Sequence, residues 1–325
     1  MACHTPILLI AFNRPNHTRR VLAEILKQEP QDLYVCQDGV REGSDLDRIK
    51  CQEVRDVVNE LTSAYAVGNK RFMLHTLYQE KNLGCGPGPA VGISWFFEHV
   101  EAGLIFEDDA IPHPDFFEYA ATLLDKYKED ASVRAIGSMN VDTRKWGDGS
   151  YYFSMMNRNL CAWATWRRAW KDFDLYLRDI PWRKLDKALI GYGCTFSERE
   201  FWLDRLVEAQ HNAQGGKSWD MQFFMSIWLN GGKGIIPNVN LSSNIGTVGE
   251  GTHQMGSGNI IDNIPTEPIL PLIHPSSVII QYQADREFYN RYFDRSSHTF
   301  MWMIARVNKR LKRLTGHQGS WFKKK

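Results

Sequence analysis

The sequence predicts an α/β protein with a mostly parallel, twisted, Rossmann-like sheet and helices on both faces. Within the first 140 residues, short apolar runs alternate with segments of helical periodicity, the pattern of a doubly wound sheet. Polar residues follow three of these runs directly, in the stretches NRP, QDG and EDD. Ligands of such sheets bind beyond the carboxyl ends of the strands, so the three stretches are expected at one binding edge.

The first expected strand is the apolar run at 6–12, typical of a strand covered on both faces. Further strands are expected at 32–39, 71–80, 103–106 and 133–139. Helical spacing of apolar residues predicts helices at 18–28, 44–66, 89–100 and 115–128. One face of the 44–66 helix carries Leu46, Ile49, Val54, Val57, Val58 and Leu61.

The second half is less regular and contains eight tryptophans between residues 146 and 228. Helices are expected at 197–210 and 219–230, and a strand within 232–246 that leads into a glycine-rich loop. The sequence has no internal repeat and no low-complexity linker. We therefore expect one domain over residues 1–295, followed by a basic tail over residues 296–325.

Charge is distributed unevenly along the chain. Residues 301–325 contain eight Lys or Arg and no acid, which leaves 31 basic against 38 acidic residues elsewhere. An acidic body argues against a nucleic-acid partner. The six cysteines form no C-x-x-C pair, and no apolar run reaches the length of a membrane span. These features predict reduced thiols and a cytoplasmic location.

Three consecutive acids, Glu107, Asp108 and Asp109, follow the apolar run at 103–106. On a pleated strand Glu107 and Asp109 point to one face and Asp108 to the other. Neighbouring carboxylates repel unless a cation offsets their charge, and Mg²⁺ commonly binds one or two carboxylates together with substrate phosphates. A solvated acidic turn is the alternative, but the position directly after a buried strand favours a divalent metal.

Four segments together resemble nucleotide-sugar glycosyltransferases of the GT-A fold: PILLIAFNRP, the QDG strand end, NLGCGPGPAVGISWFF and LIFEDDAIPHPDFF. The likeness is to enzymes similar to N-acetylglucosaminyltransferase I and to the large bacterial inverting family. It covers residues 5–255 and is firmest up to residue 140. The resemblance implies a nucleotide-binding half at 1–140 and an acceptor-side half at 141–295.

In that family the acidic triplet is a variant of the D-x-D motif. The resemblance implies that Asp109 coordinates Mn²⁺, or Mg²⁺, bridging the donor diphosphate, while Glu107 and Asp108 face ribose and sugar. His253 lies in a loop with five glycines between residues 246 and 258. Many enzymes of this fold place a late histidine on the metal or diphosphate, so His253 is a second candidate ligand, although a lone loop histidine is usually a bystander.

The resemblance also assigns the other strand ends. Asp38 matches the acid that contacts the nucleobase, and Asn13 and Arg14 match the nucleotide-binding loop after the first strand. Asn82 and Gly84 match an N-x-G turn whose following helix lines the donor pocket. From the residues alone this turn could equally be an ordinary strand-to-helix connection, since it lacks the ending of a phosphate-binding P-loop.

An inverting transferase needs a general base for the acceptor hydroxyl. Asp220 in KSWDMQFF resembles the tryptophan-aspartate motif that supplies this base. An acid in the first turn of a helix more often only complements the helix dipole. Glu198 and Glu200 are therefore kept as alternative candidates.

The tail sequence IARVNKRLKRL places Ile304, Val307, Leu311 and Leu314 on one helical stripe among five basic residues. This pattern is typical of a basic amphipathic helix on an anionic membrane, here the inner face of the cell membrane. A helix packed on the domain is the equal alternative.

Taken together, the sequence predicts a metal-dependent inverting glycosyltransferase. It would move a sugar from a nucleotide-diphosphate donor, expected to be UDP-linked, to a hydroxyl of a glycan or lipid-linked acceptor. The rival hypotheses are a sugar nucleotidyltransferase and a non-catalytic protein that binds sugar nucleotides or glycans. The first rival usually has a glycine-rich turn after the first strand, and AFNRPNHTRR has no glycine.

Overall fold

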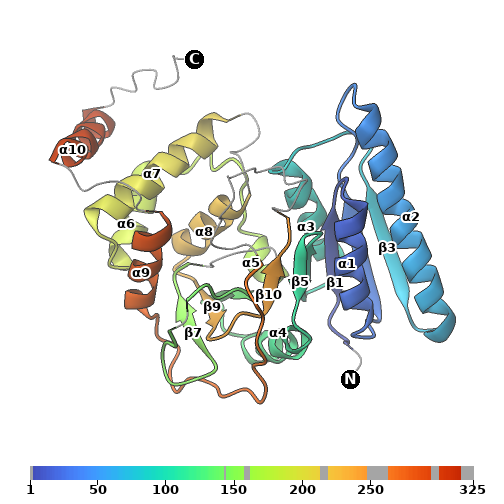
Figure 1. Ribbon diagram of the computed structural model, residues 1–325. Helices are drawn as coiled ribbons and strands as arrows, with labels where there is room; N and C mark the ends of the chain where they lie inside the picture. Colours follow the sequence, from blue (N-terminus) through green and yellow to red (C-terminus); the bar gives the residue numbers. More distant parts are fainter. Residues whose placement is uncertain are drawn as a thin grey trace.

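The computed structural model describes residues 3–142, 144–156, 162–212, 219–246, 263–293 and 300–315. An eight-stranded sheet has the strand order β3-β2-β1-β4-β8-β6-β9-β7 (Figure 1). Its strands are β1 (Ile7–Ala11), β2 (Asp32–Gln37), β3 (Met73–Tyr78), β4 (Ala102–Glu107), β6 (Val133–Gly137), β7 (Tyr151–Ser154), β8 (Ala162–Trp166) and β9 (Lys233–Pro237). A separate two-stranded sheet pairs β5 (Ala110–Pro112) with β10 (Ser242–Asn244).

The expected alternation of strands and helices is confirmed in the first half of the chain. Strands β1 to β4 pair in parallel, through β1 with β2, β2 with β3, and β1 with β4. The segment expected at 133–139 forms β6, but it does not extend this parallel series directly. Strand β8 lies between β4 and β6 and is antiparallel to both. The sheet is therefore mixed in its second half, where β7 also runs antiparallel to β9.

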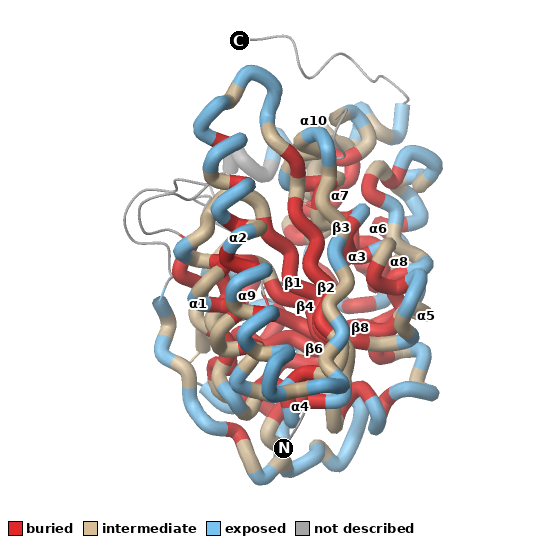
Figure 2. The backbone as a smooth tube through the Cα atoms, turned by 90° about the vertical axis from the view of Figure 1, so that its right-hand side faces the viewer, coloured by how far each residue is buried: buried red, intermediate tan, exposed pale blue. Residues whose placement is uncertain are grey.

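Helices cover both faces of the sheet (Figures 1 and 2). They are α1 (Pro15–Leu26), α2 (Asp45–Gly68), α3 (Pro87–His99), α4 (Asp115–Lys126), α5 (Arg167–Trp170), α6 (Trp182–Gly191), α7 (Phe196–His211), α8 (Asp220–Leu229), α9 (Tyr282–Tyr292) and α10 (Phe300–Thr315). None of these helices, as far as the structure describes them, is long and apolar enough to cross a bilayer.

The pleat of β1 divides the core into two layers. Leu8 and Ile10 join the cluster formed by α3 and the helices α6 to α8. Ile7 and Leu9 join the other cluster, which contains apolar residues of α1 and α4. Because successive side chains of a strand point to opposite faces, a continuous apolar run is what a strand between two helical layers requires.

The prediction that Leu46 and Ile49 pack with the apolar face of the second helix is wrong, because both are exposed. The buried stripe of α2 instead passes through Asp47, Cys51 and Val54. Ile49 lies about 200° around the helix from Asp47, so it cannot share that stripe. The inward position in the first turn is held by a carboxylate, which the apolar periodicity did not reveal.

Close contact between α3 and β2 gives a prediction at Gly92. A Cβ atom there would lie 2.7 Å from Sγ of Cys36 and 2.9 Å from its Cβ. We expect Gly92→Ala to lower the free energy of unfolding by about 1–3 kcal/mol through overpacking, measured by urea denaturation. The control is Gly68→Ala at the end of α2, where a Cβ meets nothing within 4 Å. That change should be neutral or stabilise by up to about 1 kcal/mol, and equal losses at both positions would contradict the packing argument.

Candidate functional site

The three polar stretches meet at one edge of the sheet, as expected. In the parallel register Ala11 of β1 lies beside Gln37 of β2, and Ile10 lies beside Glu107 of β4. The residues that follow these strands therefore continue past the same carboxyl edge. This is the edge at which open α/β sheets bind ligands.

Arg14 supplies the positive charge that the acidic triplet needs. Its Nη2 donates to Oδ1 of Asp108, and its Nη1 donates to Oδ2 of Asp109 at 3.0 Å. All three side chains are largely buried, so the pairing is shielded from water and strengthened by the low local dielectric. The guanidinium ties the loop after β1 to the end of β4, across 94 residues of sequence.

One oxygen of Asp109 remains available. Oδ1 of Asp109 is buried and has no hydrogen-bond partner within the described part of the chain. A buried carboxylate oxygen without a donor is costly, and a hard cation is a suitable partner for it. No group of three or more His, Cys, Asp or Glu among the described residues is placed to hold a metal by itself. Asp109 therefore fits a divalent ion only if a ligand such as a diphosphate completes the coordination.

Asp220 lies within electrostatic reach of the triplet. Burial, followed by the charges of Asp109, Asp220 and Asp108 and opposed by Arg14, raises the pKa of Glu107 to about 8. The pKa of the Cys85 thiol is raised by desolvation and also by Asp38, Glu107 and Asp220. Asp38 after β2, Glu107 of β4 and Asp220 of α8 therefore all lie near Cys85.

Stacked aromatic rings place Asp220 at this edge. Trp163 belongs to β8 and lies beside Ile105 of β4. Trp219, the residue before α8, stacks on Trp163 with a ring-centroid distance of 5.5 Å and also contacts Trp170 edge-on. The buried rings thus seat the start of α8 next to the end of β4. Asp220 is the first residue of that helix and accepts a hydrogen bond from the amide of Met221.

Asp38 anchors the loop that precedes α3. Its Oδ1 accepts from the amides of Gly39 and Leu83, each at 2.8 Å. Its Oδ2 accepts from Nδ2 of Asn82 at 2.9 Å and from the amide of Gly84 at 3.0 Å. Gly84 has a φ of +89°, a left-handed conformation that favours glycine. The structure thus shows Asp38 and the N-x-G turn as one unit, while the nucleobase contact of Asp38 stays a prediction.

The apolar and acidic patterns did not reveal Asp47, which organises the loop after β1. Its carboxylate is fully buried and accepts from Nδ2 of Asn13 at 2.7 Å and from Nη2 of Arg41 at 2.7 Å. Buried Gln37 adds a second tie, because its Nε2 donates to the carbonyl of Phe12 at 2.8 Å. The spacing S-x-x-D at residues 44–47, typical of the start of a helix, was a signal for Asp47 in the sequence.

Gly246 packs against the ion pair of Arg14 and Asp109, and this contact was not predicted from the sequence. A Cβ atom at this position would lie 2.2 Å from Oδ2 of Asp109 and 3.1 Å from Nη1 of Arg14. The preceding residue, Ile245, donates its amide to the carbonyl of Asp109 at 2.8 Å. The backbone therefore approaches the acids as closely as a glycine permits. His253 lies outside the described residues.

The alternative bases are engaged elsewhere. Glu198 forms the capping box of α7 with Thr195. Glu200 is fully buried and accepts hydrogen bonds from Arg310 and Arg313 of α10. Both glutamates are thus structural, which leaves Asp220 as the candidate base.

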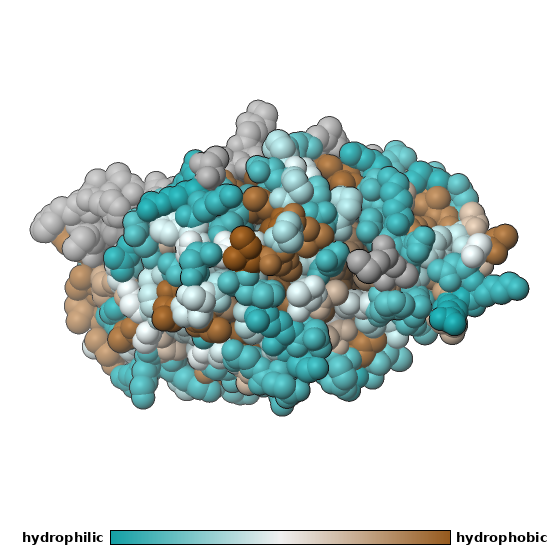
Figure 3. All heavy atoms as spheres, turned by 90° about the horizontal axis from the view of Figure 1, so that it is seen from below, coloured by the Kyte–Doolittle hydropathy of each residue, from teal (hydrophilic) through white to brown (hydrophobic). Residues whose placement is uncertain are grey.

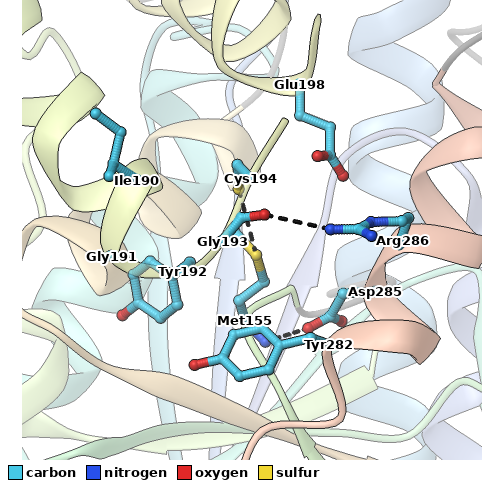
Figure 4. Close-up of a pocket in the computed structure, with 10 residues that line it drawn as sticks. All are labelled: Met155, Ile190, Gly191, Tyr192, Gly193, Cys194, Glu198, Tyr282, Asp285 and Arg286. Carbon is cyan, nitrogen blue, oxygen red and sulfur yellow. Dashed lines mark hydrogen bonds between the residues drawn. The ribbon is translucent and has the colours of Figure 1, made fainter. Parts of the chain in front are cut away.

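A cavity of about 400 Å³ lies elsewhere, between the start of α7, α9 and the end of β7 (Figure 4). Its carboxylates are already used, since Asp285 accepts from the amide of Met155 at 2.9 Å and Glu198 caps α7. Arg286 points to the carbonyl of Gly193. Because β7 runs antiparallel to β9, this cavity is at the sheet edge opposite the triplet. It contributes nothing to the candidate site.

Buried Asp47 gives a pH-dependent prediction. Hydrogen bonds from Arg41, partly opposed by burial, lower the pKa of Asp47 from its ordinary value of 3.8 to about 2. Because the pKa of Asp47 is lower in the folded than in the unfolded state, its ionised carboxylate stabilises the fold at pH values above 3.8. This stabilisation is lost as the pH falls towards 2. We expect Asp47→Asn to lower the free energy of unfolding at pH 7 by about 1–3 kcal/mol.

The free energy of unfolding of Asp47→Asn should lie below that of the wild type by a constant amount from about pH 7 to pH 5. The difference should shrink below about pH 4. Urea titrations of both proteins at each pH measure it. Asp45→Asn is the control, because Asp45 lies in the same turn and is highly exposed. An equally large loss of stability in Asp45→Asn would contradict the role given to Asp47. A loss in Asp47→Asn that grows on acidification would contradict it as well.

No family model matches the chain, and no curated protein sequence matches it. Among solved structures, S. aureus TarS 1-349 aligns with a TM-score of 0.40 and 14% identity, over 73% of this chain and 59% of that chain. The mannosyltransferase PcManGT from Pyrobaculum calidifontis, in complex with GDP-Man and Mn²⁺, aligns with a TM-score of 0.37 and 13% identity over 70% of each chain. A UDP-glucose pyrophosphorylase complexed with UDP-glucose aligns with a TM-score of 0.33 and 8% identity, over 52% of this chain and 78% of that one. At these TM-scores the alignments assign neither a family nor a function to this chain.

Proposed function

We propose that this chain is a metal-dependent inverting glycosyltransferase of the GT-A type. It would use a nucleotide-diphosphate sugar, expected to be UDP-linked, and transfer the sugar to a hydroxyl of a glycan or lipid-linked acceptor. One observation carries the proposal: Trp219 stacks on Trp163 and so places Asp220, which is more than 100 residues from the acidic triplet in sequence, beside the end of β4. Residues 1–140 would bind the donor, and residues 141–295 would form the acceptor side.

The donor end of the site is built on Arg14 and Asp109. Asp109 would hold Mn²⁺ or Mg²⁺ through its unpartnered Oδ1, together with oxygens of the donor diphosphate. When bound, the ion would neutralise charge on the leaving diphosphate as a Lewis acid. Arg14 keeps both aspartates in place and reduces the repulsion that an incoming diphosphate would meet. His253 remains a proposed second ligand.

The acceptor end is built on Asp220. Its carboxylate would take the proton of the acceptor hydroxyl while the hydroxyl oxygen bonds to the anomeric carbon and the bond from that carbon to the diphosphate oxygen breaks. Attack from the face opposite the leaving group inverts the configuration. Asp220 is the first residue of α8, and its Oδ1 accepts a hydrogen bond from the amide of Met221.

The two rival functions are disfavoured for different reasons. A sugar nucleotidyltransferase would need a basic, glycine-rich turn after β1 to receive a triphosphate. Here that turn has no glycine, and its Arg14 is already paired with two acids. A non-catalytic sugar-nucleotide or glycan-binding protein would not need Asp220 beside the triplet. The cytoplasmic location expected from the sequence stays a prediction.

Donor binding can be tested by thermal shift. We expect one nucleoside diphosphate to raise the Tm with Mn²⁺ and not with EDTA, by a few degrees at 100 times its Kd, equivalent to about 2.7 kcal/mol. Asp109→Asn should abolish the Mn²⁺-dependent part, since it removes the negative charge that would hold the ion. Asp125→Asn, an exposed change on α4, should leave it intact. The donor site is refuted if no nucleotide shifts the wild-type Tm.

The role of Asp220 can be tested separately from donor binding. We expect Asp220→Asn to reduce kcat for sugar transfer by about 100- to 10,000-fold, because it removes the general base. The donor-dependent shift in Tm should persist, and Asp125→Asn should retain wild-type kcat. Transfer at the wild-type rate by Asp220→Asn would show that another group accepts the proton. Donor binding without turnover in the wild-type protein, across a panel of glycan and lipid-linked acceptors, would favour a binding protein.

A further inference from the structure

Helix α10 lies at the end of the molecule opposite the N terminus, next to α7 (Figures 1 and 2). The opposite end, seen from below, is hydrophilic over most of its area (Figure 3). The two sides of α10 differ sharply in chemistry.

The basic side of α10 faces the domain. Arg310 and Arg313 both bind the buried carboxylate of Glu200 on α7. Arg313 also donates to Oδ1 of Asp204 at 2.5 Å, and Lys309 donates to Oδ2 of Asp204 at 2.6 Å. Five charged groups thus form one network between the two helices, in addition to a contact of Arg310 with Asp186 of α6.

The apolar side of α10 faces outward. Ile304, Val307, Leu311 and Leu314 recur at intervals of three or four residues, and each is between 38% and 52% exposed. Such an aliphatic stripe would normally be turned towards a core. The basic side chains that the sequence suggested for lipid headgroups are instead used for docking onto α6 and α7.

The ion pairs hold the helix in this rotation. If α10 rolled to bury its stripe, Glu200 would remain as a buried carboxylate without a cation, which is strongly unfavourable. The exposed stripe is therefore imposed by the docking of α10 and is not a frayed end. Exposed apolar patches commonly mark sites of contact with proteins or membranes.

We propose that the α10 stripe docks the protein onto the surface of a membrane that contains anionic lipid. Charge complementarity supports this partner. Lys312 is exposed next to the stripe, and the ten residues that follow α10 in the sequence include Trp321, Phe322 and three lysines but no acid. Aliphatic and aromatic residues combined with lysines are the composition of interfacial membrane segments, and the rest of the chain is net acidic.

A second copy of the chain fits the stripe less well. Helix α10 has 16 residues and is therefore about 24 Å long. Four half-exposed aliphatic side chains on it fall short of the roughly 1,200 Å² that a stable protein interface buries. A bilayer accepts a single shallow stripe without needing a complementary surface. The membrane surface is independent of the proposed catalytic function and would stand if that function were wrong.

The test measures co-sedimentation of the full chain with vesicles of phosphatidylcholine alone and with one quarter phosphatidylglycerol. The stripe variant combines Val307→Gln, Leu311→Gln and Leu314→Gln, which leaves every basic residue in place. The matched control combines Leu46→Gln, Ile49→Gln and Val67→Gln, three equally or more exposed aliphatics on α2. We expect the wild type and the control to bind the anionic vesicles and the stripe variant to lose affinity by about tenfold or more.

Three outcomes would overturn the proposal: no binding of the wild type to either vesicle, equal binding of the wild type and the stripe variant, or equal loss in the control. A dimer of the wild type in sedimentation equilibrium that the stripe variant abolishes would assign the stripe to a second copy. Tm measurements establish that the variants fold. If the triple change lowers the Tm, Leu314→Gln alone replaces it, with a smaller loss of binding expected.

Discussion

The pairing of Arg14 with Asp108 and Asp109 is the interaction on which the candidate site depends. Three acids at the end of a buried strand would repel one another and resist burial. One guanidinium with two parallel donors offsets two of the charges at once, and it comes from the loop after the neighbouring strand. The parallel register of β1 and β4 makes this possible, because it brings both strand ends to the same edge.

Further polar ties are arranged around that pair. Asp47 and Gln37 hold the loop after β1, and Asp38 holds the turn before α3. Each tie joins segments that follow different strands, so the edge forms a preorganised surface. The backbone at Gly246 approaches Asp109 from the second half of the chain. Within the described part of the chain, the buried Oδ1 of Asp109 is left without a hydrogen-bond partner.

The second half contributes through aromatic packing and ion pairs. The stacking of Trp219 on Trp163 positions the start of α8, and therefore Asp220, near the end of β4. On the far side of α7, buried Glu200 binds two arginines of α10. Two acids of this half thus have different roles: Asp220 lies near the end of β4, whereas Glu200 is paired with arginines that dock α10. Only their neighbours distinguish them.

The sequence by itself determined the alternation that forms β1 to β4, and it determined that Asn13, Asp38 and the triplet follow strand ends. These features are local, since periodicity and turn residues act over a few positions. Only the tertiary structure decided that β8 separates β4 from β6, that Arg14 faces the triplet, and that α10 turns its basic side inward. Those outcomes depend on contacts between residues about 60 to 110 positions apart. Their energies come from burial and pairing, which no local pattern encodes.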